Sequence, residues 1–347
     1  MPSIIVDDKG TVLNYIDSGV PHNPVFSTSY VTIFIVHGSV YTAPVFQKVM
    51  ALAANYGLRI VGINRRDYPG STPFSPSELS VLSGGSDDER VGFVRARGLE
   101  IATFVDRFIE NQGVPPISED GKSGGIALLG WSLGNAIVIS TISCCDTWPT
   151  ELQSRLKTHL RALILQEPPT VALGTPLPPK AWSPQIDTTI QESDRDPLFT
   201  QWITSYFRHG DLSKRDLDLL TYVVPATFRA PSVFTMSDEQ IAEIVYQPPA
   251  STSDMLFMIR FSEQLLASHR KAFFDKNLRQ LVPRMKVWAF TGDSTASFSL
   301  PSFWALQEED EAAGGGRINF KIVKGVNHFM HWDEPELTIQ TYLEALA

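Results

Sequence analysis

The sequence predicts an α/β protein whose sheet is mostly parallel and covered by helices on both faces. Short runs rich in Val, Ile, Leu and Phe recur without strict alternation, as expected for strands buried on both faces; they span residues 31–38, 59–65, 125–131, 162–167, 286–292 and 318–325. Helical patterns lie between these runs, for example an apolar stripe within residues 89–112. Alternation of strands and helices is typical of a sheet with right-handed crossovers.

The alternation is interrupted between about residues 170 and 284. Prolines and aromatic residues are frequent there, residues 255–274 have a strongly helical pattern, and no run resembles a buried strand. We interpret this segment as a mostly helical insertion between two strands. The predicted organisation is a core domain of residues 1–169 and 285–347 and a helical cap, or lid, of residues 170–284.

The two ends of the chain have their own signals. The N-terminal stretch predicts a β-hairpin that turns at Asp8-Lys9-Gly10. Residues 334–346 predict an amphipathic helix that has Pro335 near its start.

Composition narrows the classes of function. The 347 residues are 43% hydrophobic and 19% charged, with a formal net charge of -9, which argues against a surface for nucleic acid or for anionic membranes. The N-terminus has no basic, apolar leader, and no run approaches the roughly 18 apolar residues of a membrane span. Cys144 and Cys145 are adjacent, which favours a reducing compartment over a structural disulfide. We therefore expect an intracellular, cytoplasmic protein; its oligomeric state has no sequence signal.

The pentapeptide GWSLG, residues 130–134, is the strongest chemical signal. It matches G-x-S-x-G between a predicted strand at 125–131 and a helical run at 133–143, the context in which this motif forms a strained nucleophile turn. Gly130 and Gly134 would keep the neighbouring backbone out of its way, so that the Ser132 hydroxyl projects above the sheet edge. The following helix N-terminus favours developing negative charge.

A histidine near the C-terminus could serve Ser132 as a base. His328 comes after the last predicted strand and before the last helix, so its ring could lean over the sheet edge. His331 is the competitor, and we expect it to be a packing or capping residue. His37, at the end of another strand, is expected to be a structural histidine bonded to nearby backbone.

Together these stretches resemble the α/β-hydrolase superfamily over nearly the whole chain. The order is a His-Gly strand end at 37–38, a turn with the sequence NRRDYPGST at 64–72, the Ser132 motif, an insertion and then His328. Asn64 and Asp67 depart from the family's Asp-x-Arg-Gly-x-Gly-x-Ser turn. The resemblance is greatest to the capped esterase, lactonase and epoxide-hydrolase-like branch. Serine in place of aspartate as the nucleophile speaks against epoxide hydrolases and dehalogenases.

The resemblance implies an α/β-hydrolase fold with eight strands and a helical cap inserted after the sixth. It also implies that the backbone N–H groups of Ser39 and Leu133 form the oxyanion hole and that His328, the first histidine of His-Phe-Met-His-Trp-Asp, is the base. It implies no metal or organic cofactor, so we expect no cofactor-binding or metal-binding residues.

The acid partner of the histidine has two candidates. The family usually takes it from a Gly-x-x-Asp turn after the penultimate strand, but here Thr295 stands three residues after Gly292, and Asp293 comes too early. Some relatives place the acid at the end of the strand that follows the nucleophile helix, which is the place of Glu167. We prefer Glu167 and keep Asp293 as the alternative. Asp293 could instead be a residue that only forms its turn.

The predicted function is therefore hydrolysis of a small-to-medium apolar carboxylic ester or lactone through an acyl-enzyme on Ser132. The same residues could instead serve C–C bond hydrolysis, acyl transfer or hydroxynitrile lysis. A non-catalytic, hydrolase-like ligand-binding protein is the third hypothesis. The expected partner is the small substrate alone, without nucleic acid or membrane.

Overall fold

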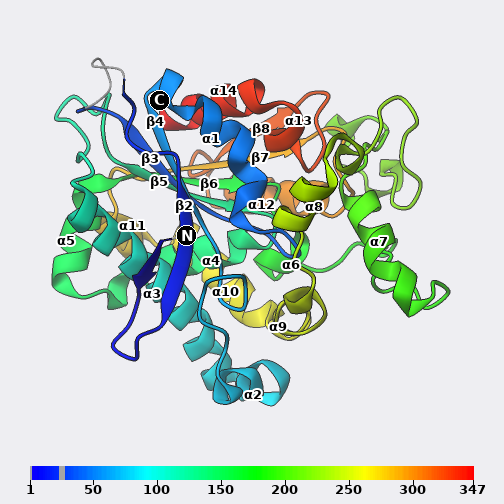
Figure 1. Cartoon of the computed structure of the whole chain (residues 1–347), viewed down its shortest axis with the longest axis horizontal. Coiled ribbons are helices and arrows are strands. Elements are labelled where there is room, and N and C mark those ends of the chain that lie inside the picture. Colours follow the sequence, from blue (N-terminus) through cyan, green and yellow to red (C-terminus); the bar gives the residue numbers. More distant parts are fainter. Residues whose placement is uncertain (1, 23–27) are drawn as a thin grey trace.

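A computed structural model describes residues 2–22 and 28–347 (Figure 1). Within these residues the strands form one eight-stranded sheet in the order β1-β2-β4-β3-β5-β6-β7-β8. The strands are β1 (Ser3–Ile5), β2 (Val12–Asp17), β3 (Val31–Val36), β4 (Leu58–Ile63), β5 (Ile126–Trp131), β6 (Leu160–Gln166), β7 (Lys286–Gly292) and β8 (Asn319–Val323). The hairpin β1–β2 and the pair β2–β4 are antiparallel, and all other pairs are parallel. The six predicted strands are confirmed, each end to within two residues, and the N-terminal hairpin is confirmed as well.

Helices cover both faces of the sheet. One face carries α1 (Gln47–Ala53), α13 (Met330–Asp333) and α14 (Pro335–Leu346), and the other carries α3 (Asp87–Gln112), α4 (Gly134–Ser143) and α5 (Thr150–His159) (Figure 1). The remaining helices are α2 (Pro76–Gly84), α6 (Thr170–Leu173), α7 (Glu192–Ile203), α8 (Asp238–Ile244), α9 (Ser253–Arg260), α10 (Ser262–Phe274), α11 (Lys276–Leu281) and α12 (Ser299–Ala312). Of the helices described, none is both long and apolar enough to cross a membrane.

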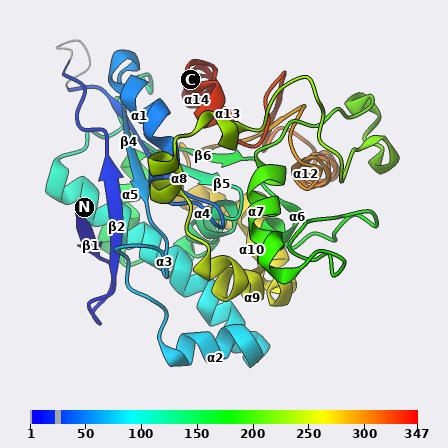
Figure 2. The same cartoon turned by 45° about the vertical axis from the view of Figure 1, so that its right-hand side comes forward.

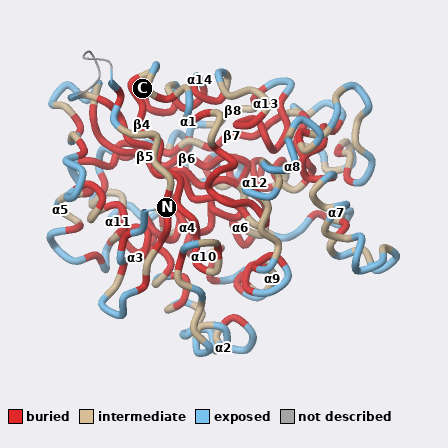
Figure 3. The backbone as a smooth tube through the Cα atoms, in the orientation of Figure 1, coloured by how far each residue is buried: buried red, intermediate tan, exposed pale blue. Residues whose placement is uncertain are grey.

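The burial of β3 explains why its sequence does not alternate. All six of its residues are buried. Phe34 and Val36 pack into the apolar cluster under α3 and α4, while Ile33 and Ile35 pack into the cluster under α1 and α14. Because both faces of the strand are covered, every position favours an apolar side chain. The buried tube through the middle of the molecule in Figure 3 follows these central strands.

Residues 170–284 enter after β6 and return at β7, as predicted. In this segment the structure has helices and 3-10 turns and no strand, apart from an isolated bridge between Val245 and Tyr41 of the core. Figure 2, in which the right-hand side of Figure 1 has come forward, shows α7 and α8 near the middle of the view and α9 below them. In contrast, α10 packs against α3 and α4. The division into a core and a cap at residues 169 and 285 stays a prediction.

The helical pattern predicted over residues 255–274 is confirmed, but as two helices and not one. The structure breaks it at Phe261, between α9 and α10, where the backbone leaves the helical region. Phe261 is fully buried beside Phe93 and Phe257. The break lets α9 pack against α2 while α10 packs on α4, so tertiary packing overrides a helical pattern that continues through the sequence.

Candidate active site

Ser132 lies in a strained turn between β5 and α4. Its φ angle is +54°, a left-handed conformation that is uncommon for a residue with a side chain and that clusters at functional sites. A Cβ atom at Gly130 would lie 2.5 Å from the Asn135 Cα, and one at Gly134 would lie 2.1 Å from the Val36 carbonyl oxygen. Neighbouring backbone lies so close to both positions that only glycine fits there. The two glycines therefore allow this sequence to form so tight a turn.

The end of β3 passes directly beside this turn. A Cβ atom at Gly38 would lie 2.7 Å from the Ser132 Cβ and 3.2 Å from its Oγ. The next residue, Ser39, and Leu133 both line the same pocket as Ser132. Neither of their backbone N–H groups donates to an acceptor within the described residues. Two free donors beside a serine hydroxyl could bind a developing oxyanion.

We expect Gly38→Ala to lower kcat/KM for an ester by about 100-fold, because its methyl group would push the strand end away from Ser132 by about an ångström. Steady-state kinetics with p-nitrophenyl butyrate would measure this. The control is Gly92→Ala in α3, where an added Cβ meets nothing within 4 Å. Wild-type kinetics in Gly38→Ala would contradict the tight fit between Gly38 and the serine turn.

Glu167 is the acidic residue that contacts His328. Its carboxylate Oε2 accepts from the His328 Nδ1 at 3.3 Å, and both side chains are buried. The φ angle of Glu167 is +51°, a second strained residue at the same sheet edge. Such a conformation at the end of β6 turns the side chain toward the neighbouring strand ends, where its partners lie.

Three further donors hold the Glu167 carboxylate. The backbone N–H of Gly292 donates to Oε1 at 2.5 Å, and the Thr291 hydroxyl donates to Oε1 at 3.2 Å. The Thr295 hydroxyl donates to Oε2 at 2.6 Å. Thr295 thus occupies the position three residues after Gly292, where the family usually has its acid, and donates to the Glu167 carboxylate. Sequence reasoning missed both threonines as site residues, although the unusual Thr295 in that turn was their signal.

The His328 ring packs against two aromatic rings. The ring centroid of Trp131 lies 5.0 Å from that of His328, and the centroid of Phe298 lies 5.1 Å from it. Trp131 also donates its Nε1–H to the His328 carbonyl at 3.1 Å. His328 and Ser132 line one pocket, but no hydrogen bond joins them among the described interactions. Contacts of this kind often tighten only when substrate binds.

The competing residues lie elsewhere. The Asp293 Oδ1 accepts from the Gly325 N–H at 2.7 Å and from the Ser294 hydroxyl, so Asp293 binds loop backbone rather than His328. His331 is buried, stacks on Phe46 and bonds Gln166 through Nδ1. Burial lowers the pKa of His331 well below its ordinary value. The structural roles that the sequence suggested for these two residues stay predictions.

His37 is also a structural residue. Its Nε2 accepts from the Arg65 N–H at 3.0 Å, so Nδ1 carries the proton and donates to the Gly38 carbonyl at 2.8 Å. Burial, reinforced by the Arg65 charge, lowers the pKa of His37 to about 3. The ring is therefore neutral and joins the end of β3 to the turn after β4.

The pocket above Ser132 has a volume of about 200 Å3 and an apolar lining. The insertion contributes most of this lining, including Trp182, Phe199, Trp202, Met255 and Met258. No Asp, Glu, Lys or Arg is among the lining residues, all of which lie in the described part of the chain. An uncharged, largely apolar molecule fits such a surface.

The sheet order, the serine turn and the histidine at the carboxyl edge define an α/β hydrolase. A model of the Alpha/beta hydrolase family matches residues 33–341, and the chain belongs to that family. A search of curated proteins found no match.

Solved structures resemble the whole chain. A candidate aryl esterase from Burkholderia cenocepacia is 14% identical, with a TM-score of 0.54 and coverage of 99% of this chain and 97% of that one. Cfl2 from the same organism is 12% identical, with a TM-score of 0.51 and coverage of 99% and 95%. At such low identity the likeness shows the fold alone.

Proposed function

We propose that this protein is a serine hydrolase of small-to-medium, uncharged apolar carboxylic esters or lactones. The observation that carries the proposal is the meeting of a Glu167–His328 pair and a strained Ser132 at one apolar pocket. A general base oriented by a buried carboxylate, next to a serine with free N–H donors, is the arrangement that acyl transfer needs.

The proposed reaction has two halves. His328 takes the proton of Ser132 as the serine oxygen attacks the carbonyl carbon, and the N–H groups of Ser39 and Leu133 bind the oxyanion. His328 then protonates the leaving alcohol, which leaves an acyl group on Ser132. Water, activated by His328, releases the acid and restores the enzyme. Glu167 orients the ring and stabilises its positive charge in both halves.

The pocket lining supports a neutral substrate. Burying a carboxylate against apolar side chains without a partner costs several kcal/mol. We therefore expect kcat/KM for mono-p-nitrophenyl succinate to be about 100-fold below that for p-nitrophenyl butyrate, which has the same four acyl carbons. Equal rates for the two esters, measured at pH 7, would contradict an uncharged acyl site.

A product screen tests the class of reaction. Purified protein would be offered p-nitrophenyl butyrate, a γ-lactone, a β-diketone and a cyanohydrin, and labelled with a fluorophosphonate probe. We expect turnover of the ester or lactone and covalent labelling of the protein. Cleavage of the β-diketone or cyanohydrin alone would assign C–C hydrolysis or hydroxynitrile lysis. Neither turnover nor labelling would leave a ligand-binding protein.

A further inference from the structure

Val40, the residue after Ser39, has a backbone conformation that valine avoids. Its φ angle is +73°, in the left-handed region, where a β-branched side chain is strained. Strained residues of this kind persist only where the surrounding structure holds them. Since Val40 follows the proposed oxyanion donor directly, whatever holds Val40 also sets the position of the Ser39 N–H.

Arg65 and Tyr68, from the turn after β4, bind the backbone on both sides of Ser39. Arg65 Nη2 donates to the Gly38 carbonyl at 3.0 Å. The Val40 N–H donates to the Tyr68 hydroxyl at 2.9 Å. The residues flanking the proposed donor are therefore both tied to this turn.

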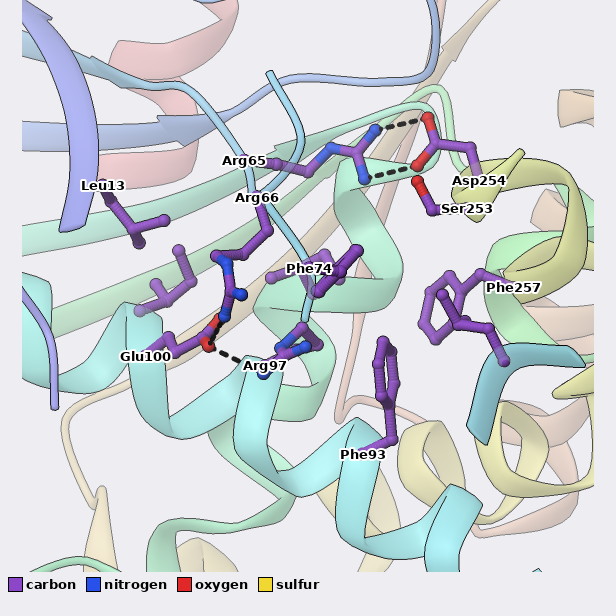
Figure 4. A pocket seen from close by; sticks show the side chains of 13 residues that line it. Leu13, Arg65, Arg66, Phe74, Phe93, Arg97, Glu100, Ser253, Asp254 and Phe257 are labelled. Carbon is purple, nitrogen blue, oxygen red and sulfur yellow. Dashed lines mark hydrogen bonds and ion pairs between the residues drawn. The ribbon is translucent and has the colours of Figure 1, made fainter. Parts of the chain in front are cut away.

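Asp254 of α9 joins these two side chains. Its carboxylate pairs with the Arg65 Nη1 and Nη2 at 2.9 and 2.8 Å, as Figure 4 shows, and accepts from the Tyr68 hydroxyl at 2.8 Å. Burial opposes the charge of Asp254, yet the Arg65 guanidinium and the hydrogen bonds hold the pKa of this carboxyl below its ordinary value. Asp254 and Arg65 line a cavity of about 30 Å3, large enough for only one or two waters. This cavity is separate from the substrate pocket.

The insertion also binds the same strand end through its backbone. The Tyr246 N–H donates to the Val40 carbonyl at 2.6 Å, and the Thr42 N–H donates to the Ile244 carbonyl at 2.9 Å. Tyr41 and Val245 form an antiparallel bridge between these bonds. Residues 244–246 of the insertion thus bind residues 40–42 of the core directly, and Asp254 reaches Val40 through the Tyr68 hydroxyl.

We propose that Asp254 and Tyr68 are positioning residues through which the insertion sets the oxyanion-binding N–H of Ser39. The neighbours of Asp254 on α9, Met255, Met258 and Ile259, line the substrate pocket. The short helix α9 therefore lines the substrate pocket with some side chains and, through Asp254, supports the segment that carries the Ser39 N–H. This inference rests on the proposed hydrolase function and adds a role for α9 beyond covering the site.

Tyr68→Phe tests the inference because it removes only the hydroxyl that links Val40 to Asp254. We expect kcat for p-nitrophenyl butyrate to fall about tenfold while KM stays within twofold, since a displaced donor weakens the transition state more than the ground state. The Ki of an alkyl trifluoromethyl ketone, which forms a tetrahedral adduct on the serine, should rise by a similar factor. Asp254→Asn should act in the same direction.

Tyr222→Phe is the matched control. It removes the hydroxyl of a buried tyrosine in the insertion, one that donates to the Leu217 carbonyl and has no part in the link from Asp254 to Val40. We expect its kcat and Ki to equal those of the wild type. Asp254→Asn leaves Arg65 unpaired in the interior and is at greater risk of unfolding, so Tyr68→Phe decides. A folded Tyr68→Phe protein with unchanged kcat and Ki would overturn the inference and leave the hydrolase proposal intact. A wild-type protein that neither turns over esters nor reacts with the probe would remove both.

Discussion

Ser132→Ala is expected to lower kcat for p-nitrophenyl butyrate by at least about 10⁴-fold, because the proposed acyl-enzyme cannot form without the hydroxyl. Fluorophosphonate labelling should disappear in the same protein. Both measurements use the folded chain, and thermal unfolding would verify that the variant has kept its structure. Ser140→Ala is a suitable control, since this buried serine in α4 bonds the Ala136 carbonyl, and it is not among the residues that line the pocket.

The strained backbone at Ser132 allows a second test of this position, through the stability of a glycine variant. Ser132→Gly should be as inactive as Ser132→Ala but more stable by about 1 kcal/mol, because glycine adopts a φ angle of +54° without a steric cost. Alanine keeps that cost. Retained turnover or labelling in either variant would show that another residue is the nucleophile.

Glu167→Gln is expected to lower kcat by about 10³–10⁴-fold, because glutamine neither stabilises the imidazolium of His328 nor keeps its tautomer. Asp293→Asn should change kcat by no more than about threefold, since Asp293 binds loop backbone at Gly325. The pair of variants separates the two acids that the sequence left open. Loss of activity in Asp293→Asn with a mild effect in Glu167→Gln would reverse the assignment.

Thr295 makes a restoring experiment possible. Its hydroxyl lies 2.6 Å from the Glu167 oxygen that faces His328, so a carboxylate at position 295 would come close to the same place. We expect Thr295→Asp to recover at least about tenfold of the activity lost in Glu167→Gln. The matched control is Thr295→Asn in the same Glu167→Gln background, which lacks the charge. If the two double variants have equal activity, a carboxylate at position 295 cannot replace Glu167. The position of the carboxylate, and not its charge alone, would then limit the reaction.

Local patterns in the chain predicted most of the sheet. The buried strands, the hairpin at Asp8-Lys9-Gly10, the insertion after β6 and the final helix were readable because periodicity and turn residues act over a few neighbours. The break at Phe261 was not readable in this way. A helical pattern continues through it, and only contacts with Phe93 and Phe257 decide that the chain turns there.

The residues of the candidate site also fall into those that the sequence indicated and those that only the structure revealed. Motif and order along the chain were enough to select Ser132, His328, Ser39 and Leu133 as candidates, since each follows a recognisable strand end. Choosing between Glu167 and Asp293 required the positions of β6, β7 and β8 side by side, because the two carboxylates differ in direction and not in local sequence. The link from Asp254 to Val40 has no signal in the local sequence at all.

By itself the sequence determined the class of fold and the serine turn, since these depend on short-range propensity and on glycines that local backbone demands, and it offered His328 as a candidate through the family resemblance. Tertiary structure alone decided which acid meets the histidine, which side chains form the pocket and how the insertion braces the strand after Gly38. Those are contacts between residues up to about 200 positions apart, such as Arg65 and Asp254, and no local pattern encodes their direction.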